Sequence, residues 1–118
     1  MSVSNEPAVI AYDDFAKVDV RAGTVRAAEP LAGARKPAYV LRIDFGPELG
    51  ERRSSVQITR RYAAEALIGT QVCAVVNFPP KRIAGVQSEV LVLGMDDAGG
   101  NVIVVRPTYA VPNGRRLY

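Results

Sequence analysis

Two neighbouring segments of the chain alternate apolar and polar residues with a period of two, which favours a sheet with one buried face. In residues 38–45 the apolar face consists of Tyr39, Leu41, Ile43 and Phe45. In residues 52–59 one face is polar throughout and consists of Ser55, Gln57 and Thr59. A strand of this second kind has one side in the core and one side available to a ligand.

The rest of the chain predicts more short strands, at residues 18–28, 71–76, 89–95 and 101–106. Gly23 predicts a bulge or a sharp bend in the first of them. Residues 59–67 predict one short helix. A single helix between the third and fourth strands is the arrangement of the OB-fold. We therefore predict an all-β chain with a short helix, a five-stranded OB-fold barrel with N- and C-terminal extensions.

The length of 118 residues suits a single domain. We expect residues 1–12 to form a flexible N-terminus, and residues 13–118 to form the OB-fold domain with a C-terminal dimerisation extension. No apolar run approaches the ~20 residues of a membrane span. The first residues also lack the charged and apolar regions of a secretory signal, so the expected location is the cytoplasm.

The composition argues against catalysis. Histidine is absent, which removes the usual general base near neutral pH and the commonest zinc ligand. The single cysteine, Cys73, lies in an apolar run and is expected to pack as a small hydrophobic residue. Neither common glycine-rich phosphate loop occurs. We expect no enzyme activity, no metal and no cofactor.

Positive charge is concentrated in the second half of the chain. Residues 1–51 hold six basic and eight acidic residues, whereas residues 52–118 hold nine basic and four acidic ones. Twelve of the fifteen basic residues are arginine, the side chain suited to forked phosphate contacts. This distribution is compatible with a nucleic-acid partner, and equally with a solubilising surface.

One segment carries a family resemblance. Residues 76–94 read VNFPPKRIAGVQSEVLVLG, and similar support comes from KVDVRAGTV at 17–25, SSVQITRRY at 54–62 and PNGRR at 112–116. These segments resemble the tRNA-binding domain family, and within it the small free-standing members described as export-related chaperones. Synthetase-type members tend to have Gly-Met where this chain has Val90-Leu91. The resemblance implies an OB-fold, a homodimer, and binding to tRNA, to unfolded or precursor polypeptides and to the export machinery.

Seven residues are candidate nucleic-acid contacts: Arg21, Ser55, Gln57, Asn77, Lys81, Arg82 and Ser88. Lys81 and Arg82 follow two prolines, which would present both cations rigidly to phosphates from a loop. The amide of Asn77 and the hydroxyl of Ser88 could contact RNA, or could instead bond the local backbone. Phe78 is the aromatic residue nearest this segment. We expect it to pack in the core, with base stacking as the alternative.

Apolar residues also occur outside the predicted barrel, before its first strand and in the C-terminal tail. Because an apolar tail on a small barrel must cover something, we expect a two-fold interface formed by Tyr12, Phe15, Tyr109, Val111, Leu117 and Tyr118. The alternative is a tail that folds back on its own barrel.

The function favoured by these features is a dimeric, non-enzymatic tRNA-binding protein that contacts RNA through a basic loop. Chaperone-type binding of unfolded or precursor polypeptides in a dimer groove, with little RNA role, is the alternative. A purely structural role with incidental charge comes third.

Overall fold

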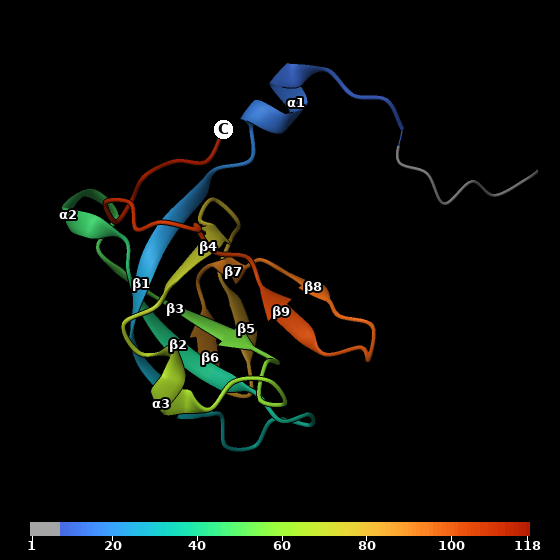
Figure 1. The fold of residues 1–118 in the computed structure, drawn as a ribbon, viewed down its shortest axis with the longest axis vertical. Coiled ribbons are helices and arrows are strands. Elements are labelled where there is room, and N and C mark those ends of the chain that lie inside the picture. The colour runs from blue at the N-terminus through green and yellow to red at the C-terminus, as the bar shows by residue number, and fades with distance from the viewer. Residues whose placement is uncertain (1–7) are drawn as a thin grey trace, which may run out of the picture.

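The structure is a computed structural model that describes residues 8–118. Its centre is a five-stranded antiparallel sheet in the order β3-β2-β1-β4-β7 (Figure 1). The strands are β1 (Val20–Pro30), β2 (Tyr39–Asp44), β3 (Glu51–Val56), β4 (Gln71–Val75) and β7 (Leu91–Val92). The strand β1 pairs with β2 through residues 24–30 and with β4 through residues 20–24, so it bends from one partner to the other.

The sheet curls until its two edges nearly meet, and this closes an OB-fold barrel. The edge strands β3 and β7 are bridged by the segment that precedes β7. The N–H of Glu89 donates to the carbonyl of Arg53 at 2.8 Å, and the Ser54 hydroxyl donates to the carbonyl of Val90 at 2.9 Å. The N–H of Ser55 donates to the Ser88 hydroxyl at 3.0 Å. The predicted barrel is therefore confirmed.

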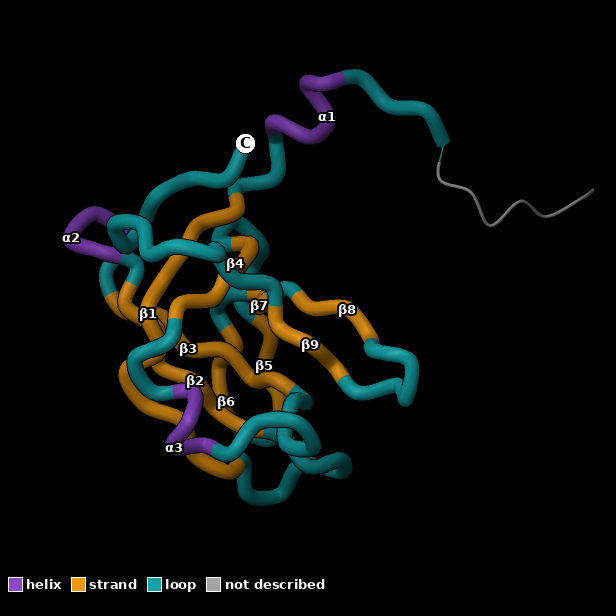
Figure 2. Tube along the Cα trace, in the orientation of Figure 1, coloured by secondary structure: helices purple, strands orange, loops and turns teal. Residues whose placement is uncertain are grey.

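Two hairpins and three short helices decorate the barrel (Figure 2). The hairpins are β5 (Lys81–Ile83) with β6 (Val86–Ser88), and β8 (Gly94–Asp96) with β9 (Val102–Val104). The helices are α1 (Tyr12–Ala16), α2 (Gly46–Leu49) and α3 (Ala64–Leu67). No helix within residues 8–118 has the length and apolar character needed to cross a membrane. The prediction of a flexible N-terminus falls mostly on residues outside this described part.

The core follows the alternation seen in the sequence. Leu41, Ile43 and Phe45 of the β2 region are completely buried, as are Val25 and Ala74 from the neighbouring strands. Aliphatic residues fill most of the interior because the chain has no tryptophan. The strand β4 is buried on both faces, since a second cluster of Val20, Cys73 and Val75 packs on its outer side. Cys73 packs there as a small hydrophobic residue, and burial raises the pKa of its thiol.

The helix after β3 is shorter than the predicted span of residues 59–67. The side chain of Tyr62 is held between two strands, because its hydroxyl accepts the N–H of Val104 at 3.0 Å. Its carbonyl accepts the hydroxyl of Tyr39 at 2.8 Å, and the N–H of Ala66 donates to Ala63 instead of to Tyr62. The helix α3 therefore begins only at Ala64.

Gly23 lies beside the bend at which β1 passes from β4 to β2, which was one of its two predictions, and it serves a close approach there instead of forming a bulge. The register shift in β1 lies between Val25 and Ala27. A Cβ atom at Gly23 would lie 2.6 Å from Ile43 Cγ2 and 2.8 Å from Phe45 Cδ1. Both neighbours are completely buried and cannot move aside.

We expect Gly23→Ala to lower the free energy of unfolding by about 1–3 kcal/mol, since the added methyl overpacks a filled core. Urea denaturation measures this change. Gly99→Ala is the matched control, because its Cβ would meet only the side chains of Asn101 at 3.3 Å and Asp97 at 3.5 Å, both on the surface and farther away than the neighbours of Gly23. Equal stability of the two variants would contradict the close-approach explanation.

The C-terminal tail folds back on its own barrel, which is the alternative that the sequence left open for its apolar residues. The strand β2 pairs only with residues 24–30 of β1. On the same side of β1, the tail pairs with residues 20–22 instead. The N–H of Ala22 donates to the Arg115 carbonyl at 3.0 Å, and the N–H of Leu117 donates to the Val20 carbonyl at 2.9 Å. The tail's backbone is thus paired internally, although several of its side chains remain exposed.

Candidate nucleic-acid interface

The polar outer face of β3 and the residues just after it form the centre of the candidate interface. Ser54, Val56 and Ile58 point into the barrel, which leaves Ser55 and Gln57 on the outer side. Gln57 is exposed and Ser55 is half-buried. Within residues 8–118, neither side chain donates or accepts a hydrogen bond. Both are therefore available to a ligand.

Three hollows meet at these two residues. The largest, of about 690 Å³, lies between residues 33–38 and the tip of the β5–β6 hairpin. A second, of about 380 Å³, lies between Phe78 and the segment that closes the barrel. A third, of about 350 Å³, runs from Gln57 past Arg60 towards the β8–β9 tip. We call this continuous surface, which consists of the residues that line the three hollows, the β3 groove.

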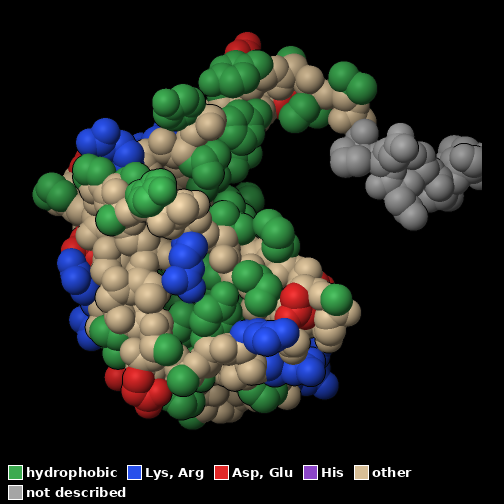
Figure 3. Space-filling model, in the orientation of Figure 1, with side chains coloured by type: hydrophobic (Ala, Val, Ile, Leu, Met, Phe, Trp, Pro, Cys, Tyr) green, Lys and Arg blue, Asp and Glu red, His purple; other side chains and the backbone are tan. Residues whose placement is uncertain are grey.

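The β3 groove carries positive charge that the protein itself does not neutralise. Among the described residues, four cations that line it have no carboxylate within 4.0 Å: Arg35, Lys36, Arg60 and Lys81. Several other arginines of the barrel are paired with a carboxylate, for example Arg26 with Asp44 at 3.1 Å. In the lower half of Figure 3, blue Lys and Arg side chains border exposed hydrophobic ones.

Lys81 and Arg82 do not act as a pair. They lie in a strand, β5, where the sequence predicted a loop, and successive residues of a strand point to opposite faces. Lys81 lines the second hollow beside Ile83. Arg82 lines none of the three hollows, and its guanidinium donates to the Gly85 carbonyl at 3.1 Å.

Ser88 lines the groove but is already used by the fold. Its hydroxyl accepts the N–H of Ser55, so it helps to close the barrel. Glu89 beside it accepts the N–H of Arg53 through Oε1 at 3.1 Å. Of the seven candidate contacts, the structure brings four together at the groove: Ser55, Gln57, Lys81 and Ser88.

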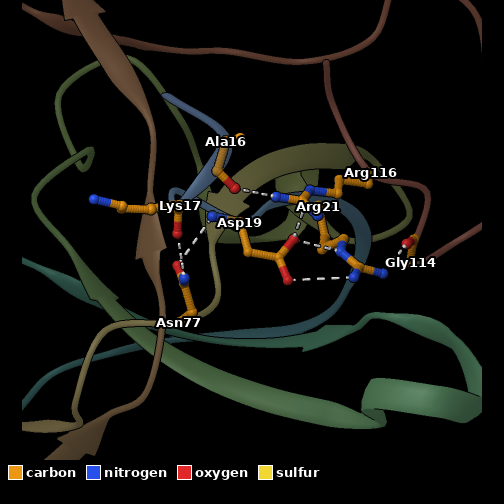
Figure 4. A network of polar contacts seen from close by, with 7 residues as sticks. All are labelled: Ala16, Lys17, Asp19, Arg21, Asn77, Gly114 and Arg116. Carbon is orange, nitrogen blue, oxygen red and sulfur yellow. Dashed lines mark hydrogen bonds and ion pairs between the residues drawn. The ribbon is translucent and has the colours of Figure 1, made fainter. Parts of the chain in front are cut away.

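Arg21 and Asn77 are placed elsewhere, in a network at the base of α1 (Figure 4). Asn77 accepts the N–H of Asp19 at 3.0 Å and donates to the Lys17 carbonyl at 2.7 Å. Arg21 Nε donates to Asp19 Oδ1 at 2.6 Å, and this bond raises the pKa of the guanidinium. Arg116 lies 3.5 Å from the same carboxylate. These side chains bind the protein's own segments together.

Arg61 also lies at the groove, but Asp97 neutralises it. Arg61 Nε is 2.9 Å from Asp97 Oδ2, which connects the segment after β3 to the β8–β9 turn. The backbone N–H of Asn101, the Arg61 guanidinium and the N–H of Gly99 all bond this carboxylate. Together, with the Asn101 bond the largest cause, they lower the pKa of Asp97 to about 2.

This shift predicts a specific acid sensitivity. The pKa of Asp97 in the folded state lies below its ordinary value of 3.8. The ionised carboxylate therefore stabilises the fold fully above pH 3.8, and this contribution is lost as the pH falls towards 2. We expect the stability difference between wild type and Asp97→Asn, measured by urea denaturation, to shrink over this interval. A difference that stays constant would contradict the shift.

Sequence reasoning missed three of the unpaired cations and misplaced an aromatic residue. Arg35 and Lys36 lie between the first two predicted strands, and Arg60 lies in the predicted helix at 59–67. Their common signal is position, since loops next to the second and third strands border the binding face of an OB-fold. Phe78 does not pack in the core as expected, because it is 53% exposed.

Five of the six predicted interface residues have exposed side chains, even though the tail's backbone pairs with its own barrel. Tyr118 is fully exposed, Tyr109 is 84% exposed and Tyr12 is 72% exposed. The rings of Tyr12 and Phe15 lie 6.2 Å apart on α1. Leu117 is 41% exposed beside a hollow of about 380 Å³ that the half-buried Val111 also lines.

Comparisons with known proteins agree with the fold. The family model described as "Putative tRNA binding domain" matches residues 20–116. The crystal structure of chaperone CsaA from Bacillus anthracis is 52% identical, with a TM-score of 0.87 over 94% of this chain and 100% of that one. The CsaA chaperone protein from Picrophilus torridus is 44% identical, with a TM-score of 0.87 over 93% of this chain and 100% of that one.

Larger proteins contain a similar region. Methionine–tRNA ligase from Porphyromonas gingivalis is 38% identical over 108 residues, which cover 92% of this chain. The chain spans only 15% of the length of that ligase. The family match covers all or most of each of the four segments that carried the sequence resemblance, and the structural match includes the CsaA proteins. The chain belongs to the tRNA-binding domain family.

Proposed function

We propose that this chain is a non-catalytic tRNA-binding protein that holds RNA in the β3 groove. The observation that carries the proposal is the set of four cations without acidic partners, among the described residues, around one polar strand face. Neutralising phosphates with such cations releases counterions, which is the main source of affinity for nucleic acid. The family match supports tRNA as the RNA concerned, and a tRNA partner supports a location in the cytoplasm.

Within this proposal the groove residues have different roles. Arg35, Lys36, Arg60 and Lys81 contact phosphates, whereas Ser55 and Gln57 offer unused hydrogen-bonding groups to sugars or base edges. Ser88 acts by closing the barrel. Arg21 and Asn77 act by holding the start of β1 against the tail and the segment after α1, and Arg82 contributes only to the general positive field.

The protein acts as a homodimer in this proposal. Its support is the exposure of large apolar side chains on α1 and on the tail, which lie on the same end of the molecule (Figure 1). The network around Asp19 holds these two appendages together, because Arg116 donates to the Ala16 carbonyl at 2.7 Å. A two-fold axis there presents two β3 grooves on one particle.

Binding of unfolded or precursor polypeptides is the second candidate function. Its support is the similarity to the CsaA chaperones and an apolar slot where the barrel is incompletely closed. Val56, Ile58, Leu91 and Val102 line this slot between β3 and β7. An extended peptide could pair with the free edge of β3 there.

Titration of the full-length protein with tRNA at low and high salt separates the two candidates. We expect tRNA affinity to fall steeply as salt rises, and binding of a reduced, unfolded polypeptide to change little. Lys81→Ala should reduce the salt slope by about one, while Arg82→Ala removes the same charge from the same strand and leaves the slope nearly unchanged. Salt-independent tRNA binding, or none, would overturn the proposal.

A further inference from the structure

We propose that the second hollow of the β3 groove is a receptor for one unpaired nucleobase, which stacks on Phe78. This inference rests on the proposed function and assigns a subsite to it. The hollow, which we call the Phe78 pocket, is lined by Ser55, Phe78, Pro79, Lys81, Ile83, Ser88, Glu89, Val90 and Leu91. Its volume of about 380 Å³ accommodates one base.

Phe78 is placed as a stacking surface and not as a core residue. It closely follows the buried end of the β4 region, yet 53% of its surface is exposed. The residue before it, Asn77, is fixed by two hydrogen bonds to the backbone of residues 17 and 19. Pro79 and Pro80 follow it and restrict the backbone further. The ring is therefore presented on a stiff segment, which lowers the entropy lost on binding.

The rest of the pocket matches a nucleotide better than an apolar side chain. Lys81 lines the same pocket and has no carboxylate within 4.0 Å among the described residues. A phosphate next to a stacked base can pair with this ammonium. A purely apolar ligand would form no ion pair with Lys81 and no hydrogen bond with the hydroxyl of Ser55.

Glu89 gives the pocket a preference among bases. Its Oε1 accepts the N–H of Arg53, and its side chain is 32% exposed. Within residues 8–118, its Oε2 accepts no hydrogen bond. A carboxylate oxygen in this position accepts a hydrogen bond from an exocyclic amino group, as in the pairing of Glu with cytosine N4. Uracil has a carbonyl oxygen at that position, so cytosine is preferred over uracil.

Tryptophan fluorescence tests stacking directly, because the chain has no tryptophan. Phe78→Trp places a single reporter in the pocket of the full-length protein and keeps a flat aromatic face. We expect tRNA to bind this variant and to quench its emission. Ile68→Trp is the control reporter, since Ile68 is 51% exposed and lies outside the β3 groove. Its emission should not change.

Two truncations measure the contribution of the ring. Phe78→Ala should weaken tRNA binding by roughly 5- to 100-fold. Phe78→Leu keeps an apolar side chain without a π-face and should lose nearly as much. Because Phe78 is half-exposed, both variants should keep the thermal stability of wild type. In short RNA probes, wild type should bind oligocytidine more tightly than oligouridine, and Glu89→Gln should narrow this difference.

The outcomes separate this inference from the proposed function. If wild type shows no salt-sensitive tRNA binding, both are overturned. A different pair of results would overturn the pocket alone: wild type binds tRNA, but tRNA does not quench the emission of Phe78→Trp and binds Phe78→Ala as tightly as wild type. The groove would then keep its role. If the emission of the Phe78→Trp variant responds to an unfolded polypeptide and not to RNA, the pocket belongs to a peptide ligand and the inference is wrong.

Discussion

Replacing Lys36, Arg60 and Lys81 together with alanine is expected to lower tRNA affinity by roughly 100- to 1,000-fold near 0.1 M salt. Each of these cations lines the β3 groove without an acidic partner among the described residues. Each phosphate contact that is lost removes the release of about one counterion, so the salt slope should fall by about two to three. Stability should change little, because exposed charges contribute little to folding.

The control for this variant removes the same charge elsewhere. Lys17, Arg26 and Arg82 are also basic and solvent-accessible, and none of them lines the groove. Lys17 and Arg26 are paired with Asp14 and Asp44. Fluorescence anisotropy with labelled tRNA should show a much smaller loss for the alanine triple at these positions. Equal losses in the two triples would mean that only net charge matters and that the groove is not the binding surface.

Sedimentation of the full-length protein is expected to give about twice the 12.7 kDa chain mass at micromolar concentration. The double variant Tyr12→Asp and Leu117→Asp should sediment as a monomer. A two-fold interface would bury each new charge twice and place like charges near each other, so the dissociation constant should rise by roughly 100-fold or more.

Folding should survive this double substitution, because Tyr12 is 72% exposed and Leu117 pairs with Val20 through its backbone. Circular dichroism checks this point, and Ile68→Asp on another exposed site should remain dimeric. The monomeric variant should also bind tRNA more weakly, since a dimer can use both grooves on one RNA. Wild-type protein that stays monomeric at high concentration would refute the dimer and its bivalent binding.

The residues that face the core could be predicted from the sequence, because a strand buried on one side alternates apolar and polar residues locally. Leu41, Ile43 and Phe45 lie in the core as their spacing predicted. The β5–β6 hairpin was not predictable in the same way. Its strands have three residues each, and its turn has Ala84 at φ 48° followed by Gly85. The usual signal for such a turn is Asn-Gly, so nothing in the local sequence marked it.

Whether a candidate contact is free to bind RNA depends on hydrogen-bond partners that lie far away in the chain. Arg21 donates to the Gly114 carbonyl at 3.0 Å, 93 residues further along. Asn77 bonds the backbone 58 and 60 residues before it. A residue type and its neighbours show that a side chain can bond RNA, but they do not show that a distant backbone group already occupies it. Lys81 remains a candidate contact, because no such partner within residues 8–118 reaches it.

The network around Asp19 determines the end of the domain at which further polypeptide would be attached. It holds the start of β1 beside Arg116, so both ends of the domain leave the barrel together. In Figure 1 they lie at the end opposite the loop between β1 and β2. A tether at either end would raise the local concentration of this domain near its fusion partner and would leave that loop, and the groove beside it, uncovered. The same geometry suits a region that makes up 15% of a methionine–tRNA ligase.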